Sequence, residues 1–526
     1  MSEIDLPALA QPANNHEQKT PLEMQEINMA YKACKFGLFH IRLLAISFVG
    51  YNAGVLVSNS TAFLLPSAEC DLSMTLVQKG LLNAIPYLGT LFSTLIAGFL
   101  TDAFGRRIFV LVGFGGMFLF MFIGGLSQTY EVLLTTKFFE GILFATSFSA
   151  SVTLTSEFCH NDIRDRVMLC QSSFSAVGQA IVPAMAWAIL PQDWTYRFFE
   201  GKFVLNTWNF YLMIMSLWSL FTFILYASFI PESPKYLLTQ KKYAEVRSTL
   251  VKMYKLNTRK PADTYPFINI WRDREEKAAK VLPEQRVDTS FKNQIVVGLR
   301  NIKPMFRKPL LIYLILLCIS NFLIMGLYNV LRLWFPQLST IVEHYKLNGE
   351  QDLCVMLDEY TTDLRIATLN RTETDICIPN RSGTETYINS IIVGCVCLVP
   401  YLVTGVLVNK VGKKPLFFVA GLICTAVTLG LRWANSKEAI VALFSSDVAI
   451  AQTMLSLNLA LVVECFPTTS RTLAISFIMV SGRIGTLAGN IMFPILLDMG
   501  CIIPFFTLTG VVVVVVVISI FLPEKK

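Results

Sequence analysis

The chain has 526 residues, of which 54% are apolar and only 15% charged, against roughly a quarter charged in an ordinary soluble domain. Its mean hydropathy is +0.54, and it contains 39 Phe but only 4 His. These values exclude an ordinary soluble protein and indicate a polytopic helical membrane protein, for which we expect no enzymatic activity.

The N-terminal segment is polar and contains Pro7, Pro12 and Pro21. It has no basic region followed by an apolar stretch, so we expect no cleaved signal peptide. We expect residues 1–38 to form a disordered cytoplasmic tail, and the first spanning helix to act as the insertion signal.

Twelve apolar stretches follow, each near the ~20 residues that cross a bilayer. They lie at 41–65, 80–101, 108–126, 131–155, 166–190, 205–230, 309–334, 386–408, 415–432, 439–463, 472–496 and 501–522. The pattern predicts an all-α membrane protein with two six-helix halves, at 39–230 and 309–522. A partly helical cytoplasmic linker at 231–308 separates them, and a short cytoplasmic tail at 523–526 closes the chain.

Two loops carry opposite charge. Residues 231–308 contain 18 Lys/Arg and 8 Asp/Glu, a net charge of 18 − 8 = +10, and residues 337–385 contain 4 and 9, a net charge of 4 − 9 = −5. Because basic loops stay in the cytoplasm, we expect the first loop and both termini to be cytoplasmic and the second loop to be luminal or extracellular.

The acidic outer loop contains two sequons, at Asn370 and Asn380, and two cysteines, Cys354 and Cys377. An oxidising compartment permits glycosylation and a disulfide, so we expect both kinds of modification here. A third sequon, at Asn59, falls inside the first span and is expected to be unused. The other cysteines lie mostly in apolar segments without metal-ligand spacing, and we expect no metal site and no cofactor.

A short motif occurs at the same place in each half, at an offset of 405 − 98 = 307 residues. The copies are Gly98-x-x-x-Asp102-x-x-Gly105-Arg106-Arg107 and Gly405-x-x-x-Asn409-Lys410-x-Gly412-Lys413-Lys414. The first glycine allows close helix packing, the acid or amide suits a neighbouring helix N-terminus, and the second glycine permits a tight turn. We interpret the motif as a latch between helices. The positive-inside rule alone explains the cations but not the repeated spacing.

This duplicated motif resembles the loop signature of the major facilitator superfamily, whose two halves rock about a central site. The sequence Pro231-Glu232-Ser233-Pro234-Lys235-Tyr236-Leu237-Leu238 is similar to a motif of sugar porters and organic ion transporters. In those families a Glu and an Arg follow the fourth helix, and this chain has two such pairs, Glu157 with Arg164 and Glu464 with Arg471. The resemblance implies that these pairs form and break during gating.

Three further segments resemble the synaptic vesicle glycoprotein 2 family: 65–71 with Lys79-Gly80, 184–191, and Trp334-Phe335-Pro336. The chain also departs from that family. Tyr51-Asn52-Ala53-Gly54 stands where those proteins have acidic residues, Leu455 replaces a tryptophan, and the outer loop has only about 50 residues. The ligands of those proteins therefore do not transfer to this chain.

Charged residues inside spans are costly and are candidate functional groups. Arg483 lies near the middle of the eleventh span, where it can receive an anionic group or pair with a carboxylate. Lys137 and Glu140 stand three apart on the fourth span. Either they neutralise each other, or Lys137 faces the cavity and Glu140 is free to bind a proton. Asp447 in the tenth span is a second candidate proton site.

Uncharged residues can also contact an organic ligand, through stacking or oriented hydrogen bonds. The candidates are Asn52, Trp187, Tyr328 and Asn329. Arg332 and Arg432 lie near the predicted luminal ends of their spans, so we expect them to extend toward the membrane interface instead of contacting a ligand.

Two functions fit these features. The first is a secondary active transporter of a small organic, charged solute, coupled to a proton or another ion. The chain has no GxxxxGK[ST] motif, which argues against direct ATP hydrolysis. The second is a vesicle membrane protein that acts as a binding or trafficking partner. In both cases we expect a monomer in a vesicle or plasma membrane, with no nucleic-acid partner.

Overall fold

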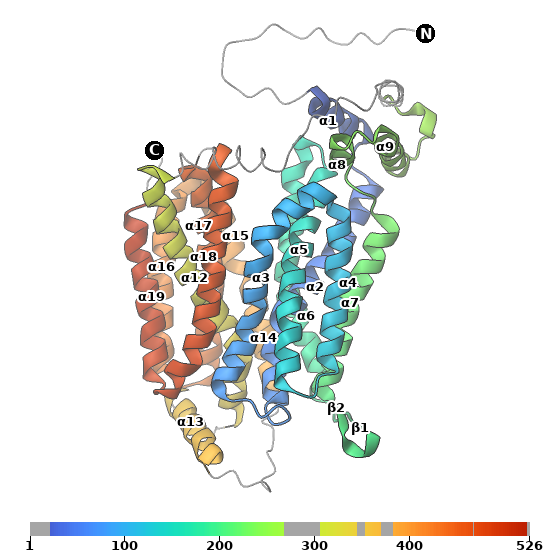
Figure 1. The fold of residues 1–526 in the computed structure, drawn as a ribbon. Coiled ribbons are helices and arrows are strands. Elements are labelled where there is room, and N and C mark those ends of the chain that lie inside the picture. Colours follow the sequence, from blue (N-terminus) through green and yellow to red (C-terminus); the bar gives the residue numbers. More distant parts are fainter. Residues whose placement is uncertain (1–21, 268–305, 345–352, 370–381, 467, 523–526) are drawn as a thin grey trace, which may run out of the picture.

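Two groups of long helices stand side by side in the computed structural model, which describes residues 22–267, 306–344, 353–369, 382–466 and 468–522 (Figure 1). The first group consists of α2 (Leu38–Ala68), α3 (Leu76–Phe104), α4 (Arg106–Gly125), α5 (Tyr130–Glu157), α6 (Asn161–Ile189) and α7 (Thr207–Phe229). The second consists of α12 (Leu310–His344), α14 (Thr384–Val396), α15 (Leu398–Val411), α16 (Lys413–Gly430), α17 (Lys437–Cys465), α18 (Thr468–Asp498) and α19 (Ile502–Ile520).

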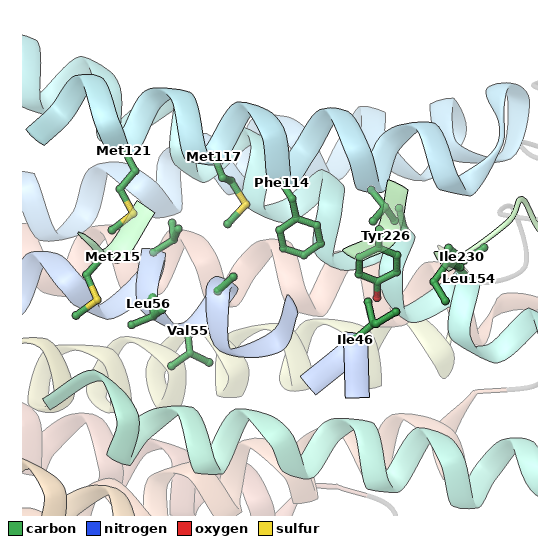
Figure 2. Close-up of a cluster of buried hydrophobic side chains, with 14 of the residues drawn as sticks. Ile46, Val55, Leu56, Phe114, Met117, Met121, Leu154, Met215, Tyr226 and Ile230 are labelled. Atoms are coloured by element: carbon green, nitrogen blue, oxygen red, sulfur yellow. The ribbon is translucent and has the colours of Figure 1, made fainter. Parts of the chain in front are cut away.

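Ten of the described helices are long and apolar enough to cross a membrane. Helix α3 and the broken pair α14–α15 complete the two sets of six that the hydropathy pattern predicts. Helices suit this environment because each satisfies its own backbone hydrogen bonds where no water is present. Each half has its own apolar core, and Figure 2 shows part of the N-terminal core, where Ile46 and Phe114 lie beside Tyr226 and Met117 lies on the other side of Phe114.

Shorter elements mark the two ends of the bundle (Figure 1). One end carries α1 (Leu22–Cys34), α8 (Pro234–Thr239) and α9 (Tyr243–Thr258). The opposite end carries α13 (Leu353–Leu369) and an antiparallel hairpin of β1 (Thr195–Phe198) and β2 (Phe203–Asn206). We refer to these as the α9 end and the α13 end.

The repeated motif forms two equivalent turns. Gly105 separates α3 from α4 with φ +99°, and Gly412 separates α15 from α16 with φ +92°. Residues with a Cβ rarely adopt this conformation, so glycine permits the abrupt change of direction that the sequence predicts at both places.

The prediction of a disordered tail over 1–38 is wrong for residues 22–34, which form α1. The prolines on which the prediction depended all precede this segment. Ile27, Ala30, Tyr31 and Cys34 recur at helical spacing and are buried, and the Cys34 thiol donates to the Leu250 carbonyl on α9 at 3.6 Å. Burial raises the pKa of Cys34 to about 12, so the thiol stays protonated and acts as a small apolar group.

The predicted outer loop at 337–385 also differs from the structure. Helix α12 continues through Pro336 to His344, and α13 occupies residues 353–369. The internal proline at 336 does not end α12. Helix α12 therefore ends ten residues beyond the predicted limit of 334.

Asn257 on α9 joins α1 to the start of α2. Its Oδ1 accepts from the Phe39 backbone N–H at 2.8 Å, and its Nδ2 donates to the carbonyls of Cys34 and Lys35 at 3.1 and 2.8 Å.

An Asn257→Ala variant loses these bonds. We therefore expect its free energy of unfolding to fall by about 1–2 kcal/mol and hydrogen exchange over residues 22–40 to become faster. The exposed α9 residue Lys252 provides the control Lys252→Ala, and equal exchange in the two variants would contradict this role.

Candidate functional site

A cavity lies between the two halves, toward the α13 end of the bundle. Its lining comes from α2 and α6 in the first half and from α12, α14, α17 and the α14–α15 junction in the second. The lining residues are Asn59, Ala62, Phe63, Gln179, Val182, Pro183, Tyr328, Arg332, Phe335, Pro336, Ser390, Val393, Gly394, Cys397 and Val448. The volume open to the centres of water molecules is about 40 Å³, which is room for a few waters in this conformation.

Arg332 is the one charged residue among these described lining residues. Its Nη2 donates to the Tyr87 hydroxyl and to Asn329 Oδ1, both at 2.8 Å, and its Nη1 donates to the Tyr328 hydroxyl at 3.4 Å. The guanidinium also lies 4.9 Å from the centre of the Tyr328 ring. Its buried Nε has no hydrogen-bond partner in the described structure, and no described carboxylate lies within ion-pair distance.

The sequence predicts that Arg332 extends toward the membrane interface, whereas in the structure its side chain lines the cavity between the halves. Asn59 and Gln179 were also missed as lining residues, and their amides lie 3.4 Å apart. Helical spacing alone does not indicate which face of α2 or α6 meets the other half.

Two of the four uncharged candidates belong to the site. Tyr328 lines the cavity, and Asn329 lies beside it, accepting from Arg332 and Tyr87 and donating to Thr486 Oγ1 at 2.9 Å. The other two do not line it. Asn52 is buried within α2 and donates to the Phe48 carbonyl at 2.7 Å, and Trp187 is 41% exposed.

Arg483 is half-buried where α18 packs against α3, outside the cavity lining. Its Nη1 donates to the Thr90 carbonyl on α3 at 2.9 Å, so it bridges the two halves. No described carboxylate lies within ion-pair distance of it. Arg483, a candidate ligand-binding residue from the sequence, therefore lies at the contact between the halves and not at the cavity wall.

The charged pair on α5 neutralises itself in this conformation. Lys137 Nζ lies 2.8 Å from Glu140 Oε2, and both side chains are fully buried. Lys137 also donates to Ser60 Oγ on α2 at 3.3 Å, whereas Glu140 Oε1 has no partner in the described structure. Of the two alternatives left open by the sequence, the structure shows the ion pair.

Asp447 lies inside the second half, between α16 and α17, and is fully buried. Its two oxygens accept from the Cys424 thiol at 3.1 Å and from the Thr428 hydroxyl at 2.9 Å, and no described cation pairs with it. The next residue, Val448, lines the cavity, but Asp447 itself does not. Asp447 is thus on a helix that lines the cavity, but its side chain contacts α16.

The repeated motif and the repeated Glu meet at the α9 end. Arg106 Nε lies 3.2 Å from a Glu157 oxygen, and Lys413 Nζ lies 2.7 Å from a Glu464 oxygen. The offsets 413 − 106 and 464 − 157 are both 307, so the two halves contain the same ion pair. Each pair joins the start of the third helix of a half to the end of its fourth helix.

The next cation in each copy reaches the sixth helix of its half. Arg107 donates to the Ala227 carbonyl at 2.7 Å, and Lys414 donates to the Ile520 carbonyl at 3.0 Å. Glu232 accepts from the backbone N–H groups of Arg106 and Arg107 at 3.2 Å, which satisfies the start of α4. These described contacts of the motif are all made within one half.

The remaining residues of the repeated motif and of the Glu–Arg pairs fall into two groups. Arg164 and Lys410 are exposed. The surroundings of Gly98, Asp102, Gly405, Asn409 and Arg471 lie outside the described part of the structure. The proposed roles of Asp102 and Asn409, and the Glu464–Arg471 pair, therefore remain predictions.

At the α13 end, an ion pair within the first half is joined to the second half by a hydrogen bond. Lys79 Nζ, which is fully buried, lies 2.7 Å from Glu69 Oε2 and donates to the Tyr360 hydroxyl of α13 at 3.1 Å. Gln337 of α12 also donates to this hydroxyl, at 3.4 Å. Burial raises the pKa of Tyr360, which keeps the phenol neutral beside the ammonium group.

The predicted Cys354–Cys377 disulfide is wrong in its pairing, because Cys354 is bonded to Cys501. Helix α13 folds back along the α18–α19 turn, which brings the two Cα atoms to 5.2 Å across 147 residues of sequence. Asp358 accepts from the Cys501 backbone N–H at 2.8 Å, and Arg365 lies 3.1 Å from Asp498. Helix α13 is therefore fastened to the second half.

The remaining predicted sites lie in segments that are not described. Cys377 and both outer sequons, Asn370 and Asn380, lie outside the described residues. Asn59, the third sequon, is buried in α2. Within the described residues, no group of three or more His, Cys, Asp or Glu is arranged to hold a metal ion.

Comparison with known proteins places the chain in a family. The Major Facilitator Superfamily profile matches residues 44–357 and 380–526. Synaptic vesicle glycoprotein 2A from Homo sapiens is 26% identical over 253 residues, which cover 47% of this chain and 34% of that protein. Synaptic vesicle glycoprotein 2B from Rattus norvegicus is 27% identical over 223 residues, or 42% and 32% of the two chains. The matches thus span about a third of these relatives.

Solved structures of transporters share the fold. The D-xylose-proton symporter has a TM-score of 0.62 at 15% identity, covering 93% of this chain and 99% of that chain. A partially occluded inward-open form of the xylose transporter XylE from E. coli has a TM-score of 0.60 at 15% identity, covering 93% and 100%.

Removing one partner of the Lys79–Glu69 pair leaves the other charge poorly solvated. We expect Lys79→Met to lower the free energy of unfolding by about 3 kcal/mol and to lower the thermal midpoint in detergent. The Lys79→Met/Glu69→Gln double variant should recover part of that loss. The more exposed Lys437–Glu385 pair at the same end provides the control, and Lys437→Met should cost less than about 1 kcal/mol. Equal losses of unfolding free energy in Lys79→Met and Lys437→Met would contradict a stabilising role of the buried Lys79 pair.

Proposed function

The chain belongs to the major facilitator superfamily, and we propose that it is a secondary active transporter of a small organic, charged solute. The observation that carries this proposal is the cavity between the halves, which both halves line and which contains a single charged group, Arg332. A largely apolar lining with a few converging polar groups is typical of a site for an organic ligand.

The distribution of polar contacts supports alternating access. The described contacts that join the halves run from the bundle middle to the α13 end, through Arg483–Thr90, Arg332–Tyr87 and Lys79–Tyr360. At the α9 end, the described motif contacts join helices of the same half. Opening the cavity toward the α13 end requires breaking the first group, whereas the second group keeps each half rigid as it moves.

The integral membrane character follows from the apolar helices and the family. We propose that the α9 end faces the cytoplasm, because the 231–308 segment is strongly basic, and that the α13 end faces the lumen or the exterior. The disulfide on α13 is in keeping with an oxidising compartment on that side. A monomer in a vesicle or plasma membrane, glycosylated on the outer loop, fits this arrangement.

A coupled proton has two candidate sites. Glu140 is paired with Lys137, so its charge is compensated, whereas Asp447 is fully buried and has no described cation partner. An ionised carboxylate is costly inside a membrane protein unless it is paired. We therefore favour Asp447 as the group that gains and loses a proton during transport.

A second candidate function is a vesicle membrane protein that binds partners without transport. The similarity to synaptic vesicle glycoproteins 2A and 2B favours it. The two functions are separated by an uptake screen in reconstituted vesicles, with organic anions, cations and neutral solutes, with and without a pH gradient. No uptake of any solute by correctly folded protein would favour the partner function.

Arg483 tests the transport mechanism. We expect Arg483→Ala to abolish uptake while the protein still reaches the membrane, because the contact with the Thr90 carbonyl and the charge between the halves are both lost. The partly exposed Arg432, in a short helical turn outside the cavity lining, provides the control variant Arg432→Ala. Normal uptake by Arg483→Ala would end this assignment.

Asp447 tests the coupling. An Asp447→Asn variant keeps the shape of the side chain but cannot exchange a proton, so we expect net uptake to lose its response to a pH gradient while solute exchange continues. The measurement is uptake into proteoliposomes at several pH gradients, compared with counterflow. A retained gradient response would remove Asp447 from the mechanism and leave Glu140 as the candidate.

A further inference from the structure

We propose that the cavity is a carboxylate site, in which an organic monocarboxylate binds the Arg332 guanidinium in place of the hydroxyls of Tyr87 and Tyr328. This inference rests on the proposed transport function and deepens it by giving the sign and chemical class of the solute. It uses a residue that the sequence pattern assigned to the membrane interface.

The positive charge of Arg332 has no anionic partner among its described contacts. The guanidinium lies deep in the bundle, and its described partners are two hydroxyls and one amide oxygen, all neutral. A cation in such surroundings is normally paired with an anion, because its desolvation is costly. Its buried Nε has no hydrogen-bond partner in the described structure, so the described contacts leave one of its donors unsatisfied.

The rest of the lining favours one carboxylate on an apolar body. Among the described lining residues, Arg332 is the single charged one, so a dianion such as a phosphate would keep an uncompensated charge. Phe63, Phe335, Val182, Val393 and Val448 supply apolar surface, and the amides of Asn59 and Gln179 supply polar contacts from the opposite half. A planar carboxylate matches the fork of a guanidinium and accepts two parallel hydrogen bonds.

Binding at this point also connects the solute to the movement of the halves. Tyr87 belongs to α3 and holds two groups of α12: it accepts from Arg332 Nη2 at 2.8 Å and donates to Asn329 Oδ1 at 3.0 Å. A carboxylate that takes the Arg332 donor weakens this bridge between the halves. The same exchange that pairs the charge therefore loosens the closed arrangement.

Arg483 does not compete for this role in the structure. It lies outside the described cavity lining and donates to a backbone carbonyl of α3. The two arginines therefore have separate functions: Arg332 binds the solute, and Arg483 joins the halves.

The test measures thermal stabilisation of the purified full-length protein by matched probes at constant ionic strength. The carboxylates are benzoate, phenylacetate and hexanoate, and the neutral isosteres are benzamide, phenylacetamide and hexanamide. We expect at least one carboxylate to raise the thermal midpoint and its amide to have no effect. Arg332→Gln should weaken that carboxylate at least about tenfold, and the control Arg432→Gln should leave it unchanged.

A second variant keeps the proposal falsifiable if Arg332→Gln does not fold. Tyr87→Phe removes the hydroxyl that the carboxylate displaces, so we expect it to bind the same carboxylate severalfold more tightly than the unmodified protein. Weaker binding by Tyr87→Phe would overturn the displacement. Equal stabilisation by acid and amide, an unchanged affinity in Arg332→Gln, or no stabilisation by any carboxylate would overturn the site.

Uptake of the stabilising carboxylate into proteoliposomes separates the two proposals. Arg332-dependent binding without uptake supports the carboxylate site and contradicts the transport function. Uptake of amines or neutral solutes that persists in Arg332→Gln supports the transport function and contradicts the carboxylate site.

Discussion

A charge buried inside a membrane bundle needs a partner of opposite charge. In the described structure, the hydrogen-bond acceptors of Arg332 are all neutral oxygens. The two tyrosines and Asn329 that surround it come from both halves of the molecule. Arg332 is thus the charged group of the proposed solute site, and it shares the contact between α3 and α12 with Asn329. By contrast, Lys79 and Lys137 are buried beside carboxylates and have their charge compensated in place. This difference separates a site that is ready for a ligand from pairs that hold helices together.

The internal repeat extends beyond the turn motif to the interactions that it makes. Arg106–Glu157 and Lys413–Glu464 are the same ion pair at an offset of 307 residues, and the adjacent cations both contact the last turns of the sixth helix of their half. Each half is therefore fastened at one end by its own set of contacts. Such halves can tilt as rigid units, because tilting need not disturb these bonds.

Much of this arrangement could be predicted from the sequence. Apolar length gave the spans, the repeated glycines gave the two turns, and polar residues within the seventh span gave Tyr328 and Asn329 as cavity residues. The failures have specific physical causes. Pro336 does not end its helix, and helical spacing does not indicate that the Arg332 side chain turns into the cavity. Cys501 is 147 residues from Cys354, and only the fold brings them together. The polar tail has few apolar residues, but those of α1 recur at helical spacing and find a surface on α9.

Helix α13 is attached to the two halves by bonds of different kinds. A covalent bond and two polar contacts fix it to the turn between α18 and α19, whereas the phenol of Tyr360 holds the ammonium group of Lys79 by a single hydrogen bond. In the proposed opening of the cavity at this end, the hydrogen bond to Lys79 is therefore the attachment expected to break, so that α13 moves with the second half.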